Sequence, residues 1–292
     1  MLATISYPPI PILDLGPLRL SLHGVMAGVG FIAGAWLMLR EARRRGFDVE
    51  KITSVLTWGL VGSIIGARAF TIPAHLDDGL LEALDPFASF SILGGFAGGI
   101  LVGAWRMRKL DLDVLAHMDL AAPGLAIGTV VGRIGDLFIV EHLGAKTNFF
   151  LGYLVKPSYD LAPQHNGLER LCDAGECGPY HHAALYDLLG AAVLLGVIYL
   201  IARNWPRLRY GVLFVGWMAW YGIQRFLIDF TRNTELPGAD ATLGPLTWSQ
   251  WSGLTIGILA TLTVIWLTTS GKTPLISAEQ DQAYGAEPVA AG

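Results

Sequence analysis

Apolar stretches about 20 residues long recur along almost the whole of this 292-residue chain. A helix needs roughly 20 consecutive apolar residues to cross the hydrocarbon core of a bilayer. Seven such segments are expected, at about 20–39, 54–74, 88–105, 117–139, 183–202, 211–230 and 250–269. Only 15% of the residues are charged and the mean hydropathy is +0.49, whereas soluble domains carry about 25% charged residues. The sequence therefore predicts an all-α fold, a polytopic membrane bundle of seven transmembrane helices.

The connections between these segments alternate in charge. Basic runs follow the first, third and fifth segments: REARRRG (40–46), RMRK (106–109) and ARNWPRLR (202–209). Because cytoplasmic loops are enriched in Lys and Arg, we expect these three loops inside the cell. The N-terminus then lies outside and the C-terminus in the cytoplasm.

Three regions flank or interrupt the predicted spans. We expect an N-terminal extracytoplasmic arm at 1–19, a membrane domain at 20–270 with a small extracytoplasmic head inserted at about 142–182, and a disordered cytoplasmic tail at 271–292. The tail is composed of small and polar residues, a composition typical of disorder. Cys172 and Cys177 of the head form either a disulfide or two free thiols, and a single CxxxxC pair is weak evidence for a metal site.

Ionisable side chains inside the predicted spans are the least expected feature of the sequence. They are Arg68 in the second span, Arg133 and Asp136 in the fourth with Glu141 just beyond it, and Arg225 and Asp229 in the sixth beside Tyr221. Such groups cost several kcal/mol at membrane depth, and spacings of three or four residues place side chains on one helical face. The pairs could simply neutralise one another, or snorkel to the headgroups. Three arginines on separate spans favour a phosphate or phospholipid site, because Arg binds phosphate in a bidentate manner.

Glycines and histidines supply the other candidates. LGGFAGG (93–99) and GLAIGTVVGRIG (124–135) serve either close helix packing or the approach of a lipid headgroup to the backbone. His23 lies early in the first span and His181 precedes the fifth, and a lone histidine in a span is more often a hydrogen-bonded structural group than a base. No HExxH or similar spacing is present, so no metal site is predicted. We also predict no cofactor and no nucleic-acid partner.

GRIGDLFIVEHLGAKT (132–147) resembles the signature of the prolipoprotein diacylglyceryl transferase family, which is close to GRxGNFxNxExxGxPT. The matching positions are Arg133, Gly135, Glu141, Gly144 and Thr147. Further family motifs follow in the expected order: GAR (66–68), DLAAP (119–123), HHAALYD (181–187), which is similar to HPSQLYE, and YGIQRFLIDFTR (221–232), which is similar to YGxxRFxxEFxR. The resemblance covers roughly residues 15 to 270.

Five positions depart from the family pattern. Asp136 and Ile139 stand where the signature has asparagine, and Asp229 replaces a glutamate. The family's SFHGG motif reads SILGG here, with Leu93 in place of a histidine that has been proposed to take part in catalysis. His23 replaces a tyrosine of the first span. The departures fall on the predicted chemistry more than on the scaffold.

The resemblance implies a transferase of the bacterial plasma membrane. Such an enzyme transfers the diacylglyceryl group of phosphatidylglycerol to the lipobox cysteine thiol in a prolipoprotein signal peptide, so that a thioether forms and glycerol 1-phosphate leaves. The departing phosphate requires fixed cations in a site of low dielectric constant. The thiol must also lose its proton near the moment of attack.

We expect Arg133 and Arg225 to hold the phosphate, with Glu141 and Asp229 positioning them and Tyr221 donating a hydrogen bond to the headgroup. The other predicted substrate-binding residues are Arg68, Asp136, Gly94, Gly95, Gly144 and His181.

The sequence constrains the proton acceptor less, because Leu93 stands at the position of the family's histidine and cannot accept a proton. His23 is the predicted base and His181 the second candidate. Alternatively, arginine-rich surroundings lower the thiol pKa enough that no base is needed.

Two other functions remain open at this stage. A catalytically altered relative would bind or handle anionic phospholipid, or use a different acceptor, and the changes at Leu93 and Asp136 favour that interpretation. A transporter or channel unrelated to lipid modification fits the intramembrane charges, but it does not explain the ordered series of motifs.

Overall fold

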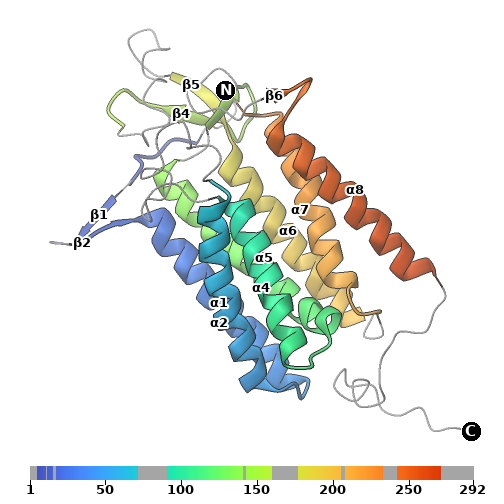
Figure 1. Ribbon diagram of the computed structural model, residues 1–292. Coiled ribbons are helices and arrows are strands. Elements are labelled where there is room, and N and C mark those ends of the chain that lie inside the picture. Colours follow the sequence, from blue (N-terminus) through green and yellow to red (C-terminus); the bar gives the residue numbers. More distant parts are fainter. Residues whose placement is uncertain are drawn as a thin grey trace, which may run out of the picture. The chain divides into compact units, whose positions relative to one another are not determined.

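Most of the described chain is helical (Figure 1). The computed structural model describes residues 5–10, 12–15, 18–71, 91–140, 143–159, 177–204, 208–232 and 242–270. Its helices are α1 (Leu22–Arg44), α2 (Val49–Ala69), α4 (Ile92–Lys109), α5 (Val114–Ile139), α6 (Ala183–Asn204), α7 (Val212–Asp229) and α8 (Trp248–Thr269). Each coincides with one of the seven predicted spans to within a few residues.

Five of these helices are long and apolar enough to cross a membrane, namely α1, α2, α5, α6 and α8. The other two have 18 residues each. Helix α4 ends on three basic residues, and α7 carries Arg225 and Asp229. These charges lower the hydropathy of α4 and α7. Because five helices have the length and composition of membrane spans, the chain is a multi-pass membrane protein. The count of seven spans stays a prediction.

Side-chain caps explain why two helices begin earlier than the apolar pattern predicts. Helix α2 starts at Val49 because the Asp48 carboxylate accepts hydrogen bonds from the backbone N–H groups of Glu50 and Lys51. Helix α8 starts at Trp248, where Thr247 and Gln250 form a capping box. Both caps satisfy N–H groups that the first helical turn leaves without a partner.

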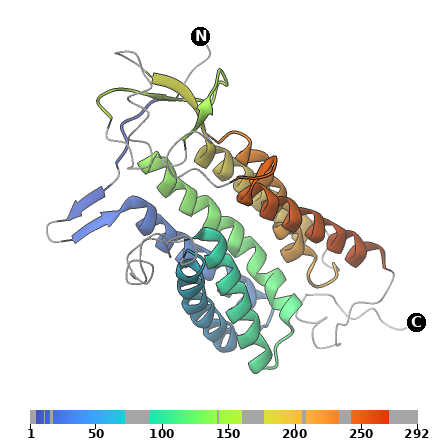
Figure 2. The same ribbon diagram turned by 45° about the horizontal axis from the view of Figure 1, so that its top comes forward.

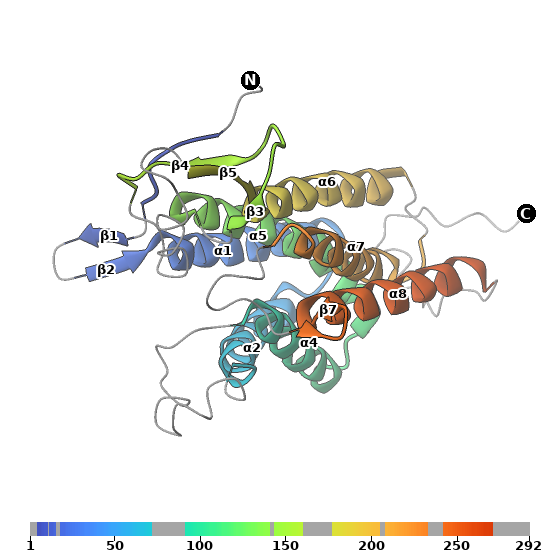
Figure 3. The same cartoon turned by 90° about the horizontal axis from the view of Figure 1, so that it is seen from above.

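The chain divides into two compact units. One comprises Met1–Leu37 and Ala121–Leu275, and the other Met38–Leu120 and Ile276–Gly292. In the second unit α2 and α4 run side by side (Figures 1 and 3). A Cβ atom at Gly66 would lie 2.4 Å from the carbonyl oxygen of Gly94, and one at Gly98 would lie 2.2 Å from that of Gly62. Only glycine permits this approach of two helix backbones.

Glycines also bring helices together in the first unit. A Cβ atom at Gly34 of α1 would lie 2.5 Å from the oxygen of Gly124 in α5. A Cβ atom at Gly222 of α7 would lie 2.5 Å from the backbone nitrogen of Gly257 in α8, and these two helices lie side by side in Figure 3. Tight helix packing therefore accounts for many of the glycines in the predicted spans.

Short strands form the connections at one end of the first unit (Figure 2). β3 (Leu143–Lys146), β5 (Cys177–His182) and β4 (Tyr153–Val155) form an antiparallel sheet in the order β3-β5-β4. Two hairpins, β1 (Ile12–Leu15) with β2 (Leu18–Ser21) and β6 (Thr242–Leu243) with β7 (Leu246–Thr247), complete the strands. The all-α prediction is thus right for the spans and incomplete for the connections. The predicted head lies partly in this sheet; its residues 160–176, including Cys172, and the predicted tail 271–292 lie outside the described residues.

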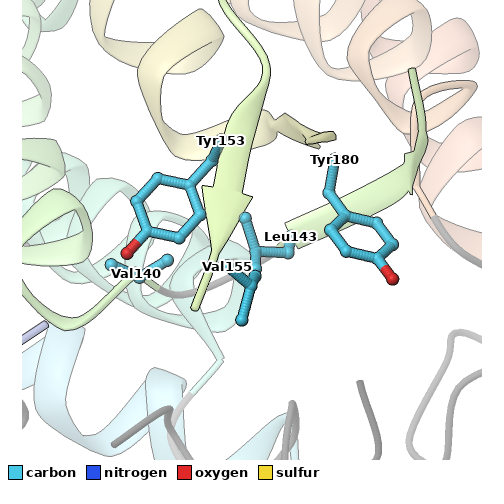
Figure 4. Packing of buried hydrophobic residues seen from close by; sticks show 5 residues of the cluster. All are labelled: Val140, Leu143, Tyr153, Val155 and Tyr180. Carbon is cyan, nitrogen blue, oxygen red and sulfur yellow. The ribbon is translucent and has the colours of Figure 1, made fainter. Parts of the chain in front are cut away.

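The sheet has a small core of its own, formed by Val140, Leu143, Tyr153, Val155 and Tyr180 (Figure 4). The phenol groups of Tyr153 and Tyr180 point in different directions from this cluster. The sheet therefore packs on Val140, the residue that follows α5.

The N-terminal segment fastens this core to the end of α5. Ile5 pairs with Tyr153, whose hydroxyl donates to the carbonyl oxygen of Tyr7 at 2.5 Å. The Tyr7 hydroxyl in turn donates to the carbonyl oxygen of Leu137 at 2.7 Å and lies 2.9 Å from Nε2 of His182. Burial raises the pKa of Tyr7 to about 12, so it remains a neutral donor. The segment fixes the backbone one residue beyond Asp136.

Candidate active site

The Arg133 guanidinium joins two buried carboxylates from different helices. Its Nη1 lies 2.5 Å from Oδ2 of Asp136, three residues further along α5, and its Nη2 lies 2.8 Å from Oδ2 of Asp187 on α6. All three side chains are buried. Such an ion pair offsets the cost of placing charges in an apolar interior only when its geometry is good, and both contacts here are short.

Asp136 also contacts the first turn of α1. Its Oδ1 forms a short contact with Nδ1 of His23. Gly135 makes this approach possible, since a Cβ atom there would lie 2.8 Å from Cβ of Met26 and 3.0 Å from Cα of His23. The second glycine of the GRIGD sequence therefore has a packing reason of its own.

A polar chain continues from Asp187 to α7. The Gln224 side-chain amide donates to the Asp187 backbone oxygen at 3.1 Å and to its Oδ1 at 3.2 Å, and it accepts from Nε1 of Trp220 at 2.6 Å. Gly190 leaves the room for it, because a Cβ atom there would lie 2.1 Å from Oε1 of Gln224. Arg133 is thus linked through Asp187 to a third helix.

Arg225 is the centre of a second charged group, between α7 and α8. Its Nε and Nη2 donate to the Ser249 hydroxyl at 2.9 and 2.6 Å, and Nη2 lies 3.5 Å from Oδ1 of Asp229. The same Oδ1 is 3.3 Å from Nε of Arg232, while the Thr247 hydroxyl donates to Oδ2 at 2.5 Å. The predicted i, i+4 pair is present, and a buried carboxylate holds two arginines.

Tyr221 lies near both charged groups. It lies one helical turn before Arg225, and its phenol interacts electrostatically with Arg133, Arg225, Asp187 and Arg232. Its ring stacks on Trp217 with centroids 5.7 Å apart. Arg133, Arg225 and Tyr221 therefore belong to one region of the first unit.

Two further predicted residues lie where the sheet meets the helices. A Cβ atom at Gly144 would lie 2.0 Å from the carbonyl oxygen of Thr231, so this glycine permits backbone contact between β3 and the end of α7. Nδ1 of His181 lies 2.9 Å from the Tyr186 hydroxyl. Burial lowers the pKa of His181, which favours the neutral imidazole.

Arg68, Gly94 and Gly95 belong to the second unit. Arg68 lies in the last turn of α2, where its Nη1 donates to the Thr71 hydroxyl at 2.6 Å. A Cβ atom at Gly95 would lie 3.3 Å from Oγ of Ser63. Helix packing explains the two glycines, and a contact of these residues with substrate stays a prediction.

Glu141, the predicted positioning residue for Arg133, lies outside the described residues, as does His142. In the described part of the chain, Asp136 and Asp187 are the carboxylates that contact Arg133. Contact of Asp136 with substrate stays a prediction.

The same arrangement of motifs is found in known proteins. A family model for prolipoprotein diacylglyceryl transferase matches residues 11–266. The chain belongs to this family. A phosphatidylglycerol–prolipoprotein diacylglyceryl transferase of Pseudomonas fluorescens is 32% identical over 284 residues, which cover 90% of this chain and 95% of the relative. Enzymes of the same name from Geobacillus kaustophilus and Bacillus cytotoxicus are 29% and 27% identical over 266 and 267 residues, each covering 89% of this chain and 92% of the relative.

Sequence reasoning missed three residues of the site in this family member: Asp187, Gln224 and Ser249. Asp187 ends the HHAALYD motif and could have been found there, because the similar HPSQLYE also ends on a carboxylate. Gln224 lies within YGIQRFLIDFTR, directly before Arg225. Ser249 carries no signal in the sequence, since a serine in the first turn of a helix is common.

Proposed function

We propose that this chain transfers the diacylglyceryl group of phosphatidylglycerol to the lipobox cysteine thiol of a prolipoprotein, forming a thioether and releasing glycerol 1-phosphate. The curated relatives carry this activity in their names. The observation that supports it most strongly in this chain is that Arg133, Arg225 and Tyr221 gather in one region of α5 and α7, two helices whose residues are mostly apolar. A soluble anion would need no such setting, whereas a lipid phosphate must be met at membrane depth.

Each group of the site has a part in the proposed reaction. When the bond between the glyceryl carbon and the phosphate oxygen breaks, negative charge grows on that oxygen. Preorganised donors facing this charge lower the barrier most in a site that excludes water. Arg225 and Arg133 supply such donors, and Tyr221 adds a hydroxyl. Asp229, Asp187 and Asp136 hold the two guanidinium groups.

The proposal includes the membrane arrangement. All seven apolar segments cross the bacterial plasma membrane, with the N-terminus and the β3-β5-β4 sheet outside and residues 271–292 in the cytoplasm. Basic loops after the first, third and fifth segments support this orientation. Signal peptides of exported proteins would then meet the site from the outer side, where Arg232 and the sheet adjoin it.

The test uses the purified full chain in vesicles that contain phosphatidylglycerol, together with a synthetic lipobox peptide. Mass spectrometry should show the cysteine gaining one diacylglyceryl group, with glycerol 1-phosphate released in equal amount. A peptide with serine in place of the cysteine, and vesicles of phosphatidylethanolamine alone, should give no product. Retention of phosphatidylglycerol without any mass shift would instead indicate a lipid-binding relative, and the proposal would then be wrong.

A further inference from the structure

The structure assigns to Asp136 a function that differs from its predicted contact with substrate. We propose that Asp136 is a positioning residue for His23, and that the resulting histidine–aspartate pair removes the proton from the acceptor thiol. The inference rests on the proposed function, because it names the base of that reaction and the residue that orients it.

The geometry of the carboxylate is the first support. Asp136 Oδ1 contacts Nδ1 of His23, and its Oδ2 contacts Nη1 of Arg133. One carboxylate therefore touches both a titratable imidazole and a cation of the predicted phosphate site. A carboxylate that accepts the N–H of Nδ1 fixes the tautomer in which Nε2 is the proton-accepting atom.

Burial is the second support. The Asp136 side chain is only 2% exposed, whereas that of His23 is 39% exposed. A buried carboxylate is available to orient the ring and not to meet a peptide. The imidazole, at the start of α1, is accessible to an incoming side chain.

The chemistry of the pair is the third support. His23 and Asp136 touch one another although 113 residues separate them in the sequence. An imidazole beside a carboxylate is the usual proton acceptor at neutral pH.

The thiol S–H bond breaks and its proton passes to Nε2 of His23, giving an imidazolium that Asp136 stabilises. The sulfur forms a bond to the glyceryl carbon, the bond from that carbon to the phosphate oxygen breaks, and the electron pair leaves with glycerol 1-phosphate. Asp136 thus adjoins both the group that gains positive charge and the arginine near the phosphate that gains negative charge.

The experiment compares two acceptor peptides that differ in one atom, a lipobox peptide with cysteine and the same peptide with selenocysteine. A selenol is already ionised at neutral pH, so it needs no base. His23→Gln can still donate a hydrogen bond to Asp136 but takes up no proton. We expect it to lose at least ~100-fold in rate with the cysteine peptide and less than about tenfold with the selenocysteine peptide.

Arg225→Lys is the matched control, because it alters the phosphate site and should lower the rate with both peptides by the same factor. Asp136→Asn should show the same preference for selenocysteine as His23→Gln. The double variant should lie within about threefold of His23→Gln alone, because both changes act on one proton transfer.

Equal losses of His23→Gln with the two peptides, or no loss with cysteine, would overturn the inference and leave the transferase function intact. If the wild-type chain modifies neither peptide, the proposed function itself fails. Thermal unfolding in detergent micelles identifies a variant that has merely lost its fold. If His23→Gln is such a variant, Asp136→Asn provides a second measurement of the preference for the selenocysteine peptide.

Discussion

Arg133 and Arg225 both lie in long helices beside aspartates, yet their surroundings differ. Arg133 contacts two carboxylates from separate helices at 2.5 and 2.8 Å, and its side chain is 9% exposed. Arg225 donates to a neutral hydroxyl at 2.6 and 2.9 Å, has its aspartate at 3.5 Å, and is 20% exposed. The first guanidinium has its charge balanced inside the protein. The second guanidinium lies closer to a neutral hydroxyl than to its own aspartate, and we expect it to be the better placed to meet an external phosphate.

One residue type therefore performs two tasks in the same site. Arg133 joins α5 to α6 and, through Asp136, adjoins His23 on α1. Arg225 lies between α7 and α8, with an aspartate that it shares with Arg232. We therefore expect changes at Arg133 to affect folding and activity together, and changes at Arg225 to affect mainly activity.

The largest effect is expected for Arg133→Ala. It leaves the buried carboxylates of Asp136 and Asp187 without their cation, which costs about 3–5 kcal/mol in the free energy of unfolding. Thermal unfolding in detergent micelles measures the loss, and the transferase assay should show no activity. If this variant unfolds at the wild-type temperature, Arg133 does not stabilise the contact between α5 and α6.

Arg225→Ala should lower the transfer rate about 10²- to 10³-fold, the usual cost of removing one donor from a site that stabilises negative charge. Because its ion pair is long and partly exposed, the free energy of unfolding should change by less than about 1 kcal/mol. Arg225→Lys keeps the charge without the planar fork, so its loss should be smaller. A large drop in stability would remove the distinction between the two arginines.

Gly222→Ala tests whether the Arg225 site depends on the contact between α7 and α8. The new Cβ atom would lie 2.5 and 2.7 Å from backbone atoms of Gly257 and Gly253, so α8 must shift. Overpacking of this kind costs about 1–3 kcal/mol, and the shift should also move Ser249 away from Arg225. Gly216→Ala is the control on the same helix, since nothing lies within 4 Å of its Cβ position; it should be neutral or slightly stabilising.

Asp187→Asn should reduce activity by roughly 10- to 100-fold, because a displacement of Arg133 by an ångström is enough for such a loss. Asp187→Glu keeps a carboxylate at this position, as at the end of HPSQLYE. Its transfer rate should stay within about threefold of the wild type, because only the length of the ion pair changes. The ratio of the transfer rates of Asp187→Asn and Asp187→Glu in the peptide assay tests whether Arg133 needs a charged partner here. Equal activity of both would show that Arg133 does not need this charge.

The smallest effect concerns His181, at the junction of sheet and helices. Burial lowers its pKa in the folded chain, so its contribution to stability is fully present above the unfolded pKa of about 6.5. As the pH falls below that value the unfolded state binds the proton more readily, and stability declines. Thermal unfolding between pH 7.5 and about 5 should show a shallower decline for His181→Gln than for the wild type. Identical slopes would show that the pKa of His181 is the same in the folded and unfolded states.

Much of this arrangement could be predicted from the chain alone. The helices lie close to the apolar segments, and the pairs Arg133–Asp136 and Arg225–Asp229 follow from spacings of three and four residues. The strands were not foreseen, because each has only two to six residues and each finds its partner through the fold. The sequence predicts His23 as the base but gives no sign that Asp136 lies beside it.

The membrane class, the helical segments and the charged pairs within one helix can be read from the chain, since a helix repeats every 3.6 residues and fixes which neighbours share a face. The contacts between helices come from the fold: Asp187 with Arg133, Ser249 with Arg225, and His23 with Asp136. Those meetings depend on how closely and at what rotation the helices approach. Glycines such as Gly135 and Gly222 set that approach, and no local pattern in the sequence encodes it.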